Sequence, residues 1–141
     1  SFGHLDRLTL QKGETFSWNY TACAITYNPA STNADIYLLH EFSHAALNHQ
    51  KYPSDIALLK MEREAWEYAR TLANEYGVTL SEESIETSLD TYRDWLHSRS
   101  VCPSCGATGI QSATLEYSCV ACHTLWRVNE ARLCTLRRYT Y

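Results

Sequence analysis

The 141-residue sequence contains no apolar run near the roughly 20 residues needed to span a bilayer, so no membrane partner is expected. It also has no signal-peptide pattern at its start. The first residue is Ser1 rather than Met, which leaves room for an upstream segment and keeps targeting open. Lys and Arg are few, and the formal charge of −4 argues against a surface built for nucleic acid, because phosphate contacts need concentrated positive charge.

Length and composition favour one globular domain with room for a small appendage. Hydrophobic residues make up 45% of the chain, which is ordinary for a protein with a modest core. The predicted fold class is α+β. Residues 1–33 read as short strands, at Leu8–Leu10, Thr15–Tyr20 and Ala22–Tyr27, and the segments that follow have helical periodicity.

The first helical stretch carries the pattern His-Glu-x-x-His, at His40, Glu41 and His44. This pattern is a zinc-protease signature. Residues four apart lie one turn above each other on a helix, so both imidazoles can reach a single metal. Glu41 lies about 100° round the helix from His40, where it can take a proton from a bound water. The alternative is a chance match on an amphipathic helix, because only three positions are fixed.

A second helix is predicted to begin at a cap formed by Ser54–Asp55 and to run to about Tyr76, with Gly77 as its stop. Glu62 and Glu64 lie on opposite shoulders of its apolar stripe. A carboxylate on a shoulder can face the two His and complete a two-His, one-Glu site with water in the fourth position. Helix geometry alone does not separate Glu62 from Glu64, and each is by default a solvated surface charge.

These two helices resemble those of the ImmA/IrrE metallopeptidases, gluzincins whose second helix carries Glu-x-x-Ala-x-x-Phe-Ala. The resemblance covers about the first half of the chain, residues 15–76, and implies a zincin-like domain with Glu62 as the third metal ligand. Trp66 departs from the family pattern, which has Asn or Asp there, and the Leu-Met-Pro segment that often follows is missing. The matching residues are His40, Glu41, His44, Glu62, Ala65, Tyr68 and Ala69.

Four of the six cysteines form two C-x-x-C knuckles, Cys102/Cys105 and Cys119/Cys122, with thirteen residues between them. This spacing predicts a closed structural zinc site of four thiolates, a zinc ribbon. Two alternatives stay open. A secreted protein could form two disulfides, and Cys119-x-x-Cys122-His123 matches c-type haem attachment, which would leave the first knuckle without a use.

Metal-bound thiolates suit a reducing compartment, which favours the cytoplasm. The remaining cysteines, Cys23 and Cys134, are interpreted as ordinary buried thiols.

A third helix is predicted from a capping box at Thr79–Glu82 to about His97, followed by a short linker, Ser98–Ser100. The aromatic tail, residues 125–141, could touch nucleic acid, although Arg residues spread over twelve positions favour packing back on the body. We expect a metallopeptidase domain over residues 1–99 and a zinc ribbon with this tail over 100–141. The basic residues of the tail are Arg127, Arg132, Arg137 and Arg138.

Together these features predict a zinc metallopeptidase that hydrolyses peptide bonds in a protein substrate, with one catalytic and one structural Zn²⁺. Glu41 would deprotonate the attacking water and pass the proton to the leaving amine. Tyr27 or His49 could help to hold the oxyanion. The strand before the zinc helix could lie at the rim of the cleft and pair with an extended peptide, or simply cover the helix. The predicted catalytic-zinc ligands are His40, His44 and Glu62.

Other classes fit less well. In metzincins a third His follows the second by six residues after a Gly turn, whereas His49 follows by five, and a continuing helix would turn it away from His40. SprT-like proteases, which act on DNA-bound proteins, also join His-Glu-x-x-His to a zinc ribbon. Their third ligand is a later His followed by Gly, a pair that is absent between His49 and His97.

The remaining alternative is an inactive module whose ribbon binds protein or nucleic acid. Glu41 argues for the enzyme, because a structural zinc would not require it.

Overall fold

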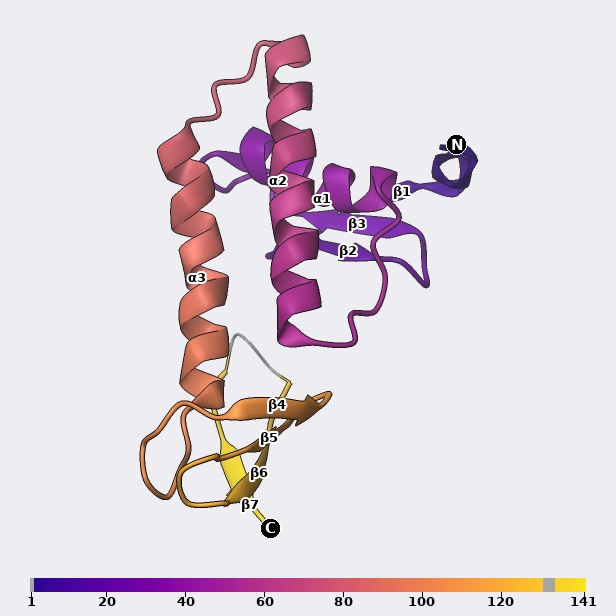
Figure 1. The fold of residues 1–141 in the computed structure, drawn as a ribbon. Coiled ribbons are helices and arrows are strands. Elements are labelled where there is room, and N and C mark those ends of the chain that lie inside the picture. Colours follow the sequence, from indigo (N-terminus) through magenta and orange to yellow (C-terminus); the bar gives the residue numbers. More distant parts are fainter. Residues whose placement is uncertain (1, 131–133) are drawn as a thin grey trace. The chain divides into compact units, whose positions relative to one another are not determined.

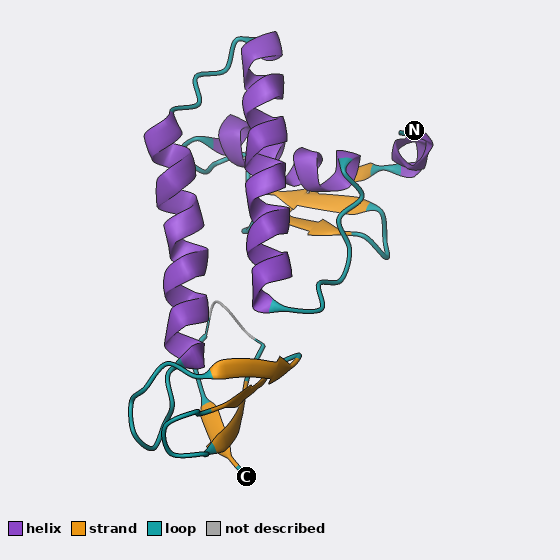
Figure 2. Ribbon diagram, in the orientation of Figure 1, coloured by secondary structure: helices purple, strands orange, loops and turns teal. Residues whose placement is uncertain are grey.

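The computed structural model describes residues 2–130 and 134–141. Over these residues the fold is α+β, as predicted, with three α-helices and two small sheets (Figures 1 and 2). The chain forms two compact units. The first unit comprises residues up to 51 together with 60–86, and the second comprises 52–59 together with 87–141. The expected division after residue 99 stays a prediction.

The sheet of the first unit has three strands in the order β1-β3-β2. A short 3-10 helix, Gly3–Arg7, precedes β1 (Thr9–Lys12), which runs parallel to β3 (Ala24–Tyr27), while β2 (Ser17–Asn19) is antiparallel to β3. The central strand β3 has neighbours on both sides. The expectation that the strand directly before the His-bearing helix could accept a peptide is therefore wrong, and β2 is an edge strand instead.

Helix α1, Ala34–Ala46, packs against β3 and β2 and carries the His-Glu-x-x-His pattern. Its N-cap is Asn33, in the left-handed region at φ 59°, and the Asp35 carboxylate accepts the N–H of Ile36. The helix stops because Asn48 also adopts a left-handed conformation, at φ 52°. Asn tolerates that region better than most residues with a side chain. This turn decides where His49 points.

Helix α2 runs over Asp55–Tyr76, with both ends as predicted. The Ser54 hydroxyl accepts the N–H of Ala57 at 3.2 Å, which satisfies a donor that the helix leaves unpaired. At the other end Gly77 takes φ +68°, a conformation that glycine adopts without steric cost.

Helix α3, Glu82–Ser100, differs from its prediction at both ends. The hydroxyl that caps its start belongs to Ser81, which accepts the N–H of Ser84 at 3.1 Å, so the expected capping box at Thr79 is wrong. The predicted linker, Ser98–Ser100, is the last turn of the helix. The Ser98 hydroxyl donates to the carbonyl of Asp94 at 2.9 Å, so its polarity is satisfied within the helix.

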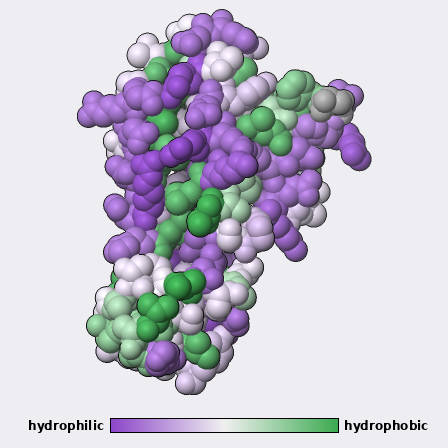
Figure 3. Space-filling view, in the orientation of Figure 1, coloured by the Kyte–Doolittle hydropathy of each residue, from purple (hydrophilic) through white to green (hydrophobic). Residues whose placement is uncertain are grey.

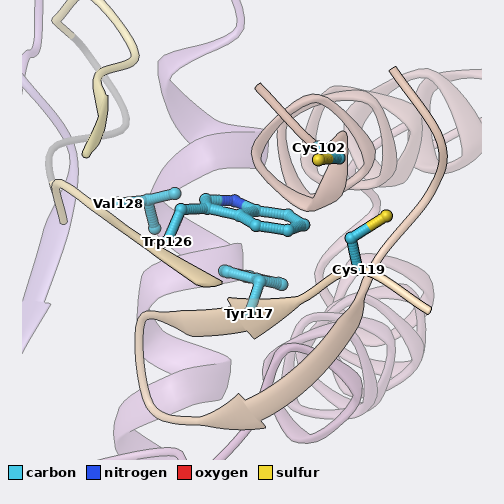
Figure 4. Packing of buried hydrophobic residues seen from close by; sticks show 5 residues of the cluster. All are labelled: Cys102, Tyr117, Cys119, Trp126 and Val128. Carbon is cyan, nitrogen blue, oxygen red and sulfur yellow. The ribbon is translucent and has the colours of Figure 1, made fainter. Parts of the chain in front are cut away.

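The second unit contains an antiparallel sheet in the order β4-β5-β6-β7. Its core packs the rings of Tyr117 and Trp126 face to face, with centroids 5.7 Å apart, beside Val128, Cys102 and Cys119 (Figure 4). The strands are β4 (Ile110–Ala113), β5 (Glu116–Ser118), β6 (Leu125–Val128) and β7 (Arg138–Thr140).

A buried ion pair joins the start of α2 to this sheet within the second unit. Arg99 is 1% exposed, and its guanidinium donates to Asp55 Oδ1 and to the hydroxyl of Tyr117. The Tyr117 hydroxyl donates in turn to Asp55 Oδ2. Gln111 completes the group, because its amide donates to Asp55 and its carbonyl accepts the Asp55 N–H. Sequence reasoning placed Arg99 in a linker and missed this cluster.

The tail contributes strands to the sheet. The guanidinium of Arg138 donates to the carbonyl of Val101 at 2.7 Å, and that of Arg127 lies over the ring of Tyr139. These contacts agree with packing on the body. Arg132 lies outside the described residues.

Two properties of the surface bear on the expectations from sequence. Hydrophobic residues lie at the surface of the unit that contains the four-stranded sheet (Figure 3). Ile110 and Leu125 in the strands, and Val120 in the loop between β5 and β6, are each more than half exposed. Among the described helices, none has the length and hydropathy required to cross a membrane. Cys23 is half-buried, but Cys134 is exposed, so its interpretation as a buried thiol is wrong.

Candidate metal centre

Three side chains from α1 and α2 converge on one point. The two Nε2 atoms of His40 and His44 lie 3.1 Å apart, because the residues stand one helical turn apart on α1. From α2, Glu62 places Oε2 3.1 Å from His40 and Oε1 3.2 Å from His44. All three residues are buried. The structure thus brings Glu62 to both imidazoles, and the family-like spacing had selected the same residue.

The distances between these atoms fit a metal ion. Ligand atoms about 2.0–2.1 Å from a tetrahedral zinc lie about 3.3–3.4 Å from one another. The observed separations among His40, His44 and Glu62 are 3.1 to 3.2 Å. Two imidazole nitrogens and one carboxylate also leave a fourth position open, as catalytic zinc sites do. The three residues could therefore hold a metal ion.

Strong mutual electrostatics hold this group together. Burial opposes the charge of Glu62, but hydrogen bonds from His40 and His44 outweigh it and keep the pKa of the carboxyl far below its ordinary value. Burial likewise opposes protonation of His44, yet its contact with Glu62 raises the pKa of the ring. A buried carboxylate with two imidazoles is costly without such compensation.

Glu41 stands beside the two imidazoles on the side of strand β2. Burial raises its pKa, and the nearby His40 and His44 oppose that rise, as does the backbone N–H of Trp18, which donates to the carboxylate. Trp18 lies in the edge strand β2, and its indole N–H donates to the carbonyl of His49 at 2.8 Å. Strand β2 thus contacts the site at two points, which fixes the position of α1 against the sheet.

The two imidazoles are supported differently on their outer sides. The ring of His40 stacks on the indole of Trp66, with centroids 4.1 Å apart and planes 25° apart. Its Nδ1 has no hydrogen-bond partner among the described residues. Trp66 is the residue that departs from the family pattern, and here it supplies a flat face rather than a polar partner.

On the other side, His44 Nδ1 lies 2.9 Å from Nδ1 of His49. Nε2 of His49 lies 3.2 Å from Glu64 Oε2. The helix does not continue to His49, so the condition under which the ring would face away from His40 is not met: α1 ends at Ala46, and the turn at Asn48 brings the ring of His49 against His44. Burial and the neighbouring His44 lower the pKa of His49. Tyr27, the other residue considered for the oxyanion, lies half-buried at the end of β3.

The four knuckle cysteines form a second group in the other unit, and their sulfurs could hold a metal ion. Cys102 and Cys122 have their sulfurs 3.6 Å apart, and those of Cys105 and Cys119 lie 3.5 Å apart. Sulfurs about 2.3 Å from a tetrahedral zinc would lie about 3.8 Å apart. All six cysteines are free thiols.

The thiols of this group differ in how readily they ionise. The hydroxyl of Thr124 lowers the pKa of Cys122, whereas Cys105 moves the other way: the backbone N–H of Ala107 favours its thiolate, but the neighbouring Cys119 and Cys122 outweigh that bond and raise its pKa to about 12. Burial opposes the charge of Cys102, but backbone N–H groups of Cys105 and Ser104 donate to its sulfur and lower its pKa to about 6. Because metals bind the thiolate, this environment suits a metal ligand. Both C-x-x-C knuckles contribute sulfurs to one cluster. The haem-attachment alternative uses only Cys119 and Cys122, so it does not account for the position of Cys102 and Cys105 in this cluster.

Comparison with known proteins adds no relative: no family model, curated protein or solved structure matches the chain.

Proposed function

We propose that this protein is a zinc-dependent metallopeptidase whose catalytic zinc is held by His40, His44 and Glu62. The observation that carries the proposal is the convergence of two imidazole Nε2 atoms and one carboxylate within 3.2 Å, next to a half-buried Glu41. A zinc ion held there supplies Lewis-acid chemistry, polarising a carbonyl and lowering the pKa of a water. The fold would then be zincin-like, and the four-cysteine unit a structural zinc ribbon.

Glu41 acts as the general base in this proposal. Its carboxylate accepts a proton from the attacking water and then donates it to the leaving amine of the substrate. Burial raises its pKa, which moves it towards the range in which a carboxylate exchanges protons readily near neutral pH. The bond from the Trp18 N–H holds the carboxylate in place while it does so.

The substrate is a protein or peptide in an extended conformation. Strand β2 is an edge of its sheet, and Trp18 in that strand touches Glu41. An extended chain added along β2 would bring a peptide bond to the base by main-chain pairing, the mode that sheet edges offer.

The test is Glu41→Gln, because the amide preserves shape while removing the base. Both forms are loaded with zinc and incubated with a peptide library of mixed sequence, and new termini are counted by mass spectrometry. We expect Glu41→Gln to keep its zinc and to lose cleavage by about 10²–10⁴-fold. Glu67→Gln is the matched control, because Glu67 is an exposed carboxylate on α2.

Equal cleavage by wild type and Glu41→Gln would remove Glu41 from the role of general base. If the zinc-loaded wild type cleaves nothing in the library, the proposal fails in favour of a binding module.

A further inference from the structure

His44 is one end of a chain of three side chains that leads out of the metal centre. Its Nδ1 lies 2.9 Å from His49 Nδ1, and Nε2 of His49 lies 3.2 Å from the Glu64 carboxylate. The side chain of His49 is only 9% exposed, while that of Glu64 is 44% exposed. The chain therefore runs from a buried ligand, through a buried imidazole, to a carboxylate that reaches solvent.

The protons on this chain follow from its chemistry. An ionised carboxylate only accepts hydrogen bonds, so the His49 nitrogen that faces Glu64 must carry a proton. A neutral imidazole has one N–H, so Nδ1 of His49 is then an acceptor. The proton between the two rings consequently belongs to Nδ1 of His44. In the neutral form that binds a metal, His44 then has its lone pair on Nε2, the atom that faces Glu62 and His40.

We propose that Glu64 and His49 are positioning residues that hold His44 with Nδ1 protonated and Nε2 presented to the metal. This inference rests on the proposed metal site and deepens it. Ligating imidazoles generally donate their second N–H to a carboxylate or carbonyl, which fixes the ring and raises its basicity. Here the imidazole of His49 stands between His44 and the Glu64 carboxylate. Glu64 therefore acts on His44 indirectly, by fixing which nitrogen of His49 accepts the His44 proton.

The backbone of His49 is fixed independently of its ring. Its N–H donates to the carbonyl of His44 at 3.0 Å, and its carbonyl accepts the indole N–H of Trp18. A substitution at position 49 therefore changes the ring while these two bonds remain. His40 supplies an internal contrast, because it is held by stacking on Trp66 and its Nδ1 has no partner among the described residues.

The test compares two replacements of His49. His49→Phe keeps a ring but removes both nitrogens, whereas His49→Gln keeps a carbonyl that can accept from His44 and an amide that can donate to Glu64. Glu64→Ala removes the other end. Lys60→Ala is the matched control, because Lys60 is an exposed partner of Glu64 at 3.9 Å that does not lie between the rings.

Zinc affinity is measured by competition with a chromophoric chelator, on protein whose four-cysteine site remains loaded. We expect His49→Phe to weaken zinc binding about 10–100-fold, and Glu64→Ala about tenfold because water can replace part of its contact. His49→Gln should stay within about threefold of wild type, and Lys60→Ala should be unchanged. In zinc-loaded wild type the His44 Nδ1 proton should give a downfield NMR resonance protected from exchange, which His49→Phe loses.

Each outcome decides something. The proposed roles of His49 and Glu64 are wrong if His49→Phe or Glu64→Ala retains wild-type zinc affinity. They are also wrong if His49→Gln binds zinc as weakly as His49→Phe. Should His49→Phe fail to fold, Glu64→Ala decides alone, because Glu64 is half-exposed. His44→Ala serves as the reference. If the wild type holds no more zinc than His44→Ala, the proposed function itself is wrong. If the wild type binds zinc but the His49 and Glu64 variants bind it equally well, only the positioning role of His49 and Glu64 is wrong.

Discussion

Glu62 and Glu64 stand two residues apart on α2, yet their carboxylates meet different imidazoles. Glu62 is 5% exposed and touches both His40 and His44, whereas Glu64 is half-exposed and touches His49. A helix turns about 200° over two residues, so the two side chains leave α2 on different sides. One helix thus supplies both a candidate ligand and a support for another ligand.

At saturating zinc we expect Glu62→Ala to bind one ion fewer per chain than wild type. Two neutral imidazoles are a poor site for a dication without the carboxylate. Glu64→Ala should keep the wild-type count, because it alters affinity rather than the set of ligands, and its stability should change by about 0.5 kcal/mol or less. Metal analysis after gel filtration gives the count. A Glu64→Ala protein that loses the ion while Glu62→Ala keeps it would show that the two roles are exchanged.

Arg99 offers a second residue-scale prediction. Arg99→Met removes the cation of a buried pair, so that Asp55 keeps only the hydrogen bonds from Tyr117 and Gln111, and the Tyr117 hydroxyl loses the donor it accepts from. We expect the free energy of unfolding to fall by about 3–5 kcal/mol, measured by urea denaturation. Arg93→Met is the control, because its pair with Asp90 is at the surface, where ion pairs contribute about 1 kcal/mol or less. Similar losses in both variants would show that burial of Arg99 has no special effect.

At the scale of elements, the end of α2 depends on one backbone conformation. Gly77 has φ +68°, and a Cβ added there would meet no atom within 4 Å. Gly77→Ala should therefore cost only the conformational strain, about 1–2 kcal/mol. Gly77→Asn should cost less, because Asn enters the left-handed region more readily. Thermal unfolding of the three proteins tests the order, and an Ala variant as stable as wild type would contradict it.

The elements show where sequence reasoning succeeds. Both ends of α2 were predictable because Ser54 and Gly77 act locally, through one hydroxyl and one backbone angle. The centre of α1 was equally accessible, since helical spacing brings His40 and His44 together wherever the helix packs.

Features that depend on tertiary contacts were missed. In the sequence, the last turn of α3 has the composition of a polar linker. The reason for an Arg at position 99 appears only in the fold, where its buried guanidinium pairs with Asp55 and Tyr117. The contact of His49 with His44 depends on the turn at Asn48, and a helical wheel, which assumes a continuous helix, cannot predict that turn. Glu62 and Glu64 were equivalent on the wheel, and the direction from which α1 approaches distinguishes them.

At the scale of the whole molecule, the two candidate metal groups belong to different compact units. Cys102→Ser with Cys105→Ser should remove one ion from the chain, because two of four thiolates are lost. The ion held by His40, His44 and Glu62 should remain. Metal analysis of the double variant should thus fall from two zinc ions to one. A double variant that still holds two ions would exclude the four-cysteine site.

The two ions should also leave at different rates. Four thiolates enclose an ion completely, whereas two imidazoles and one carboxylate leave a position open to water and to a chelator. We therefore expect mild chelation to remove one zinc within minutes and to leave the other bound for much longer. Glu62→Ala should lack the fast phase, and the Cys102/Cys105 double variant should lack the slow one, so each phase is assigned to its group. A single phase containing both ions would mean that the two groups do not differ as open and closed sites do.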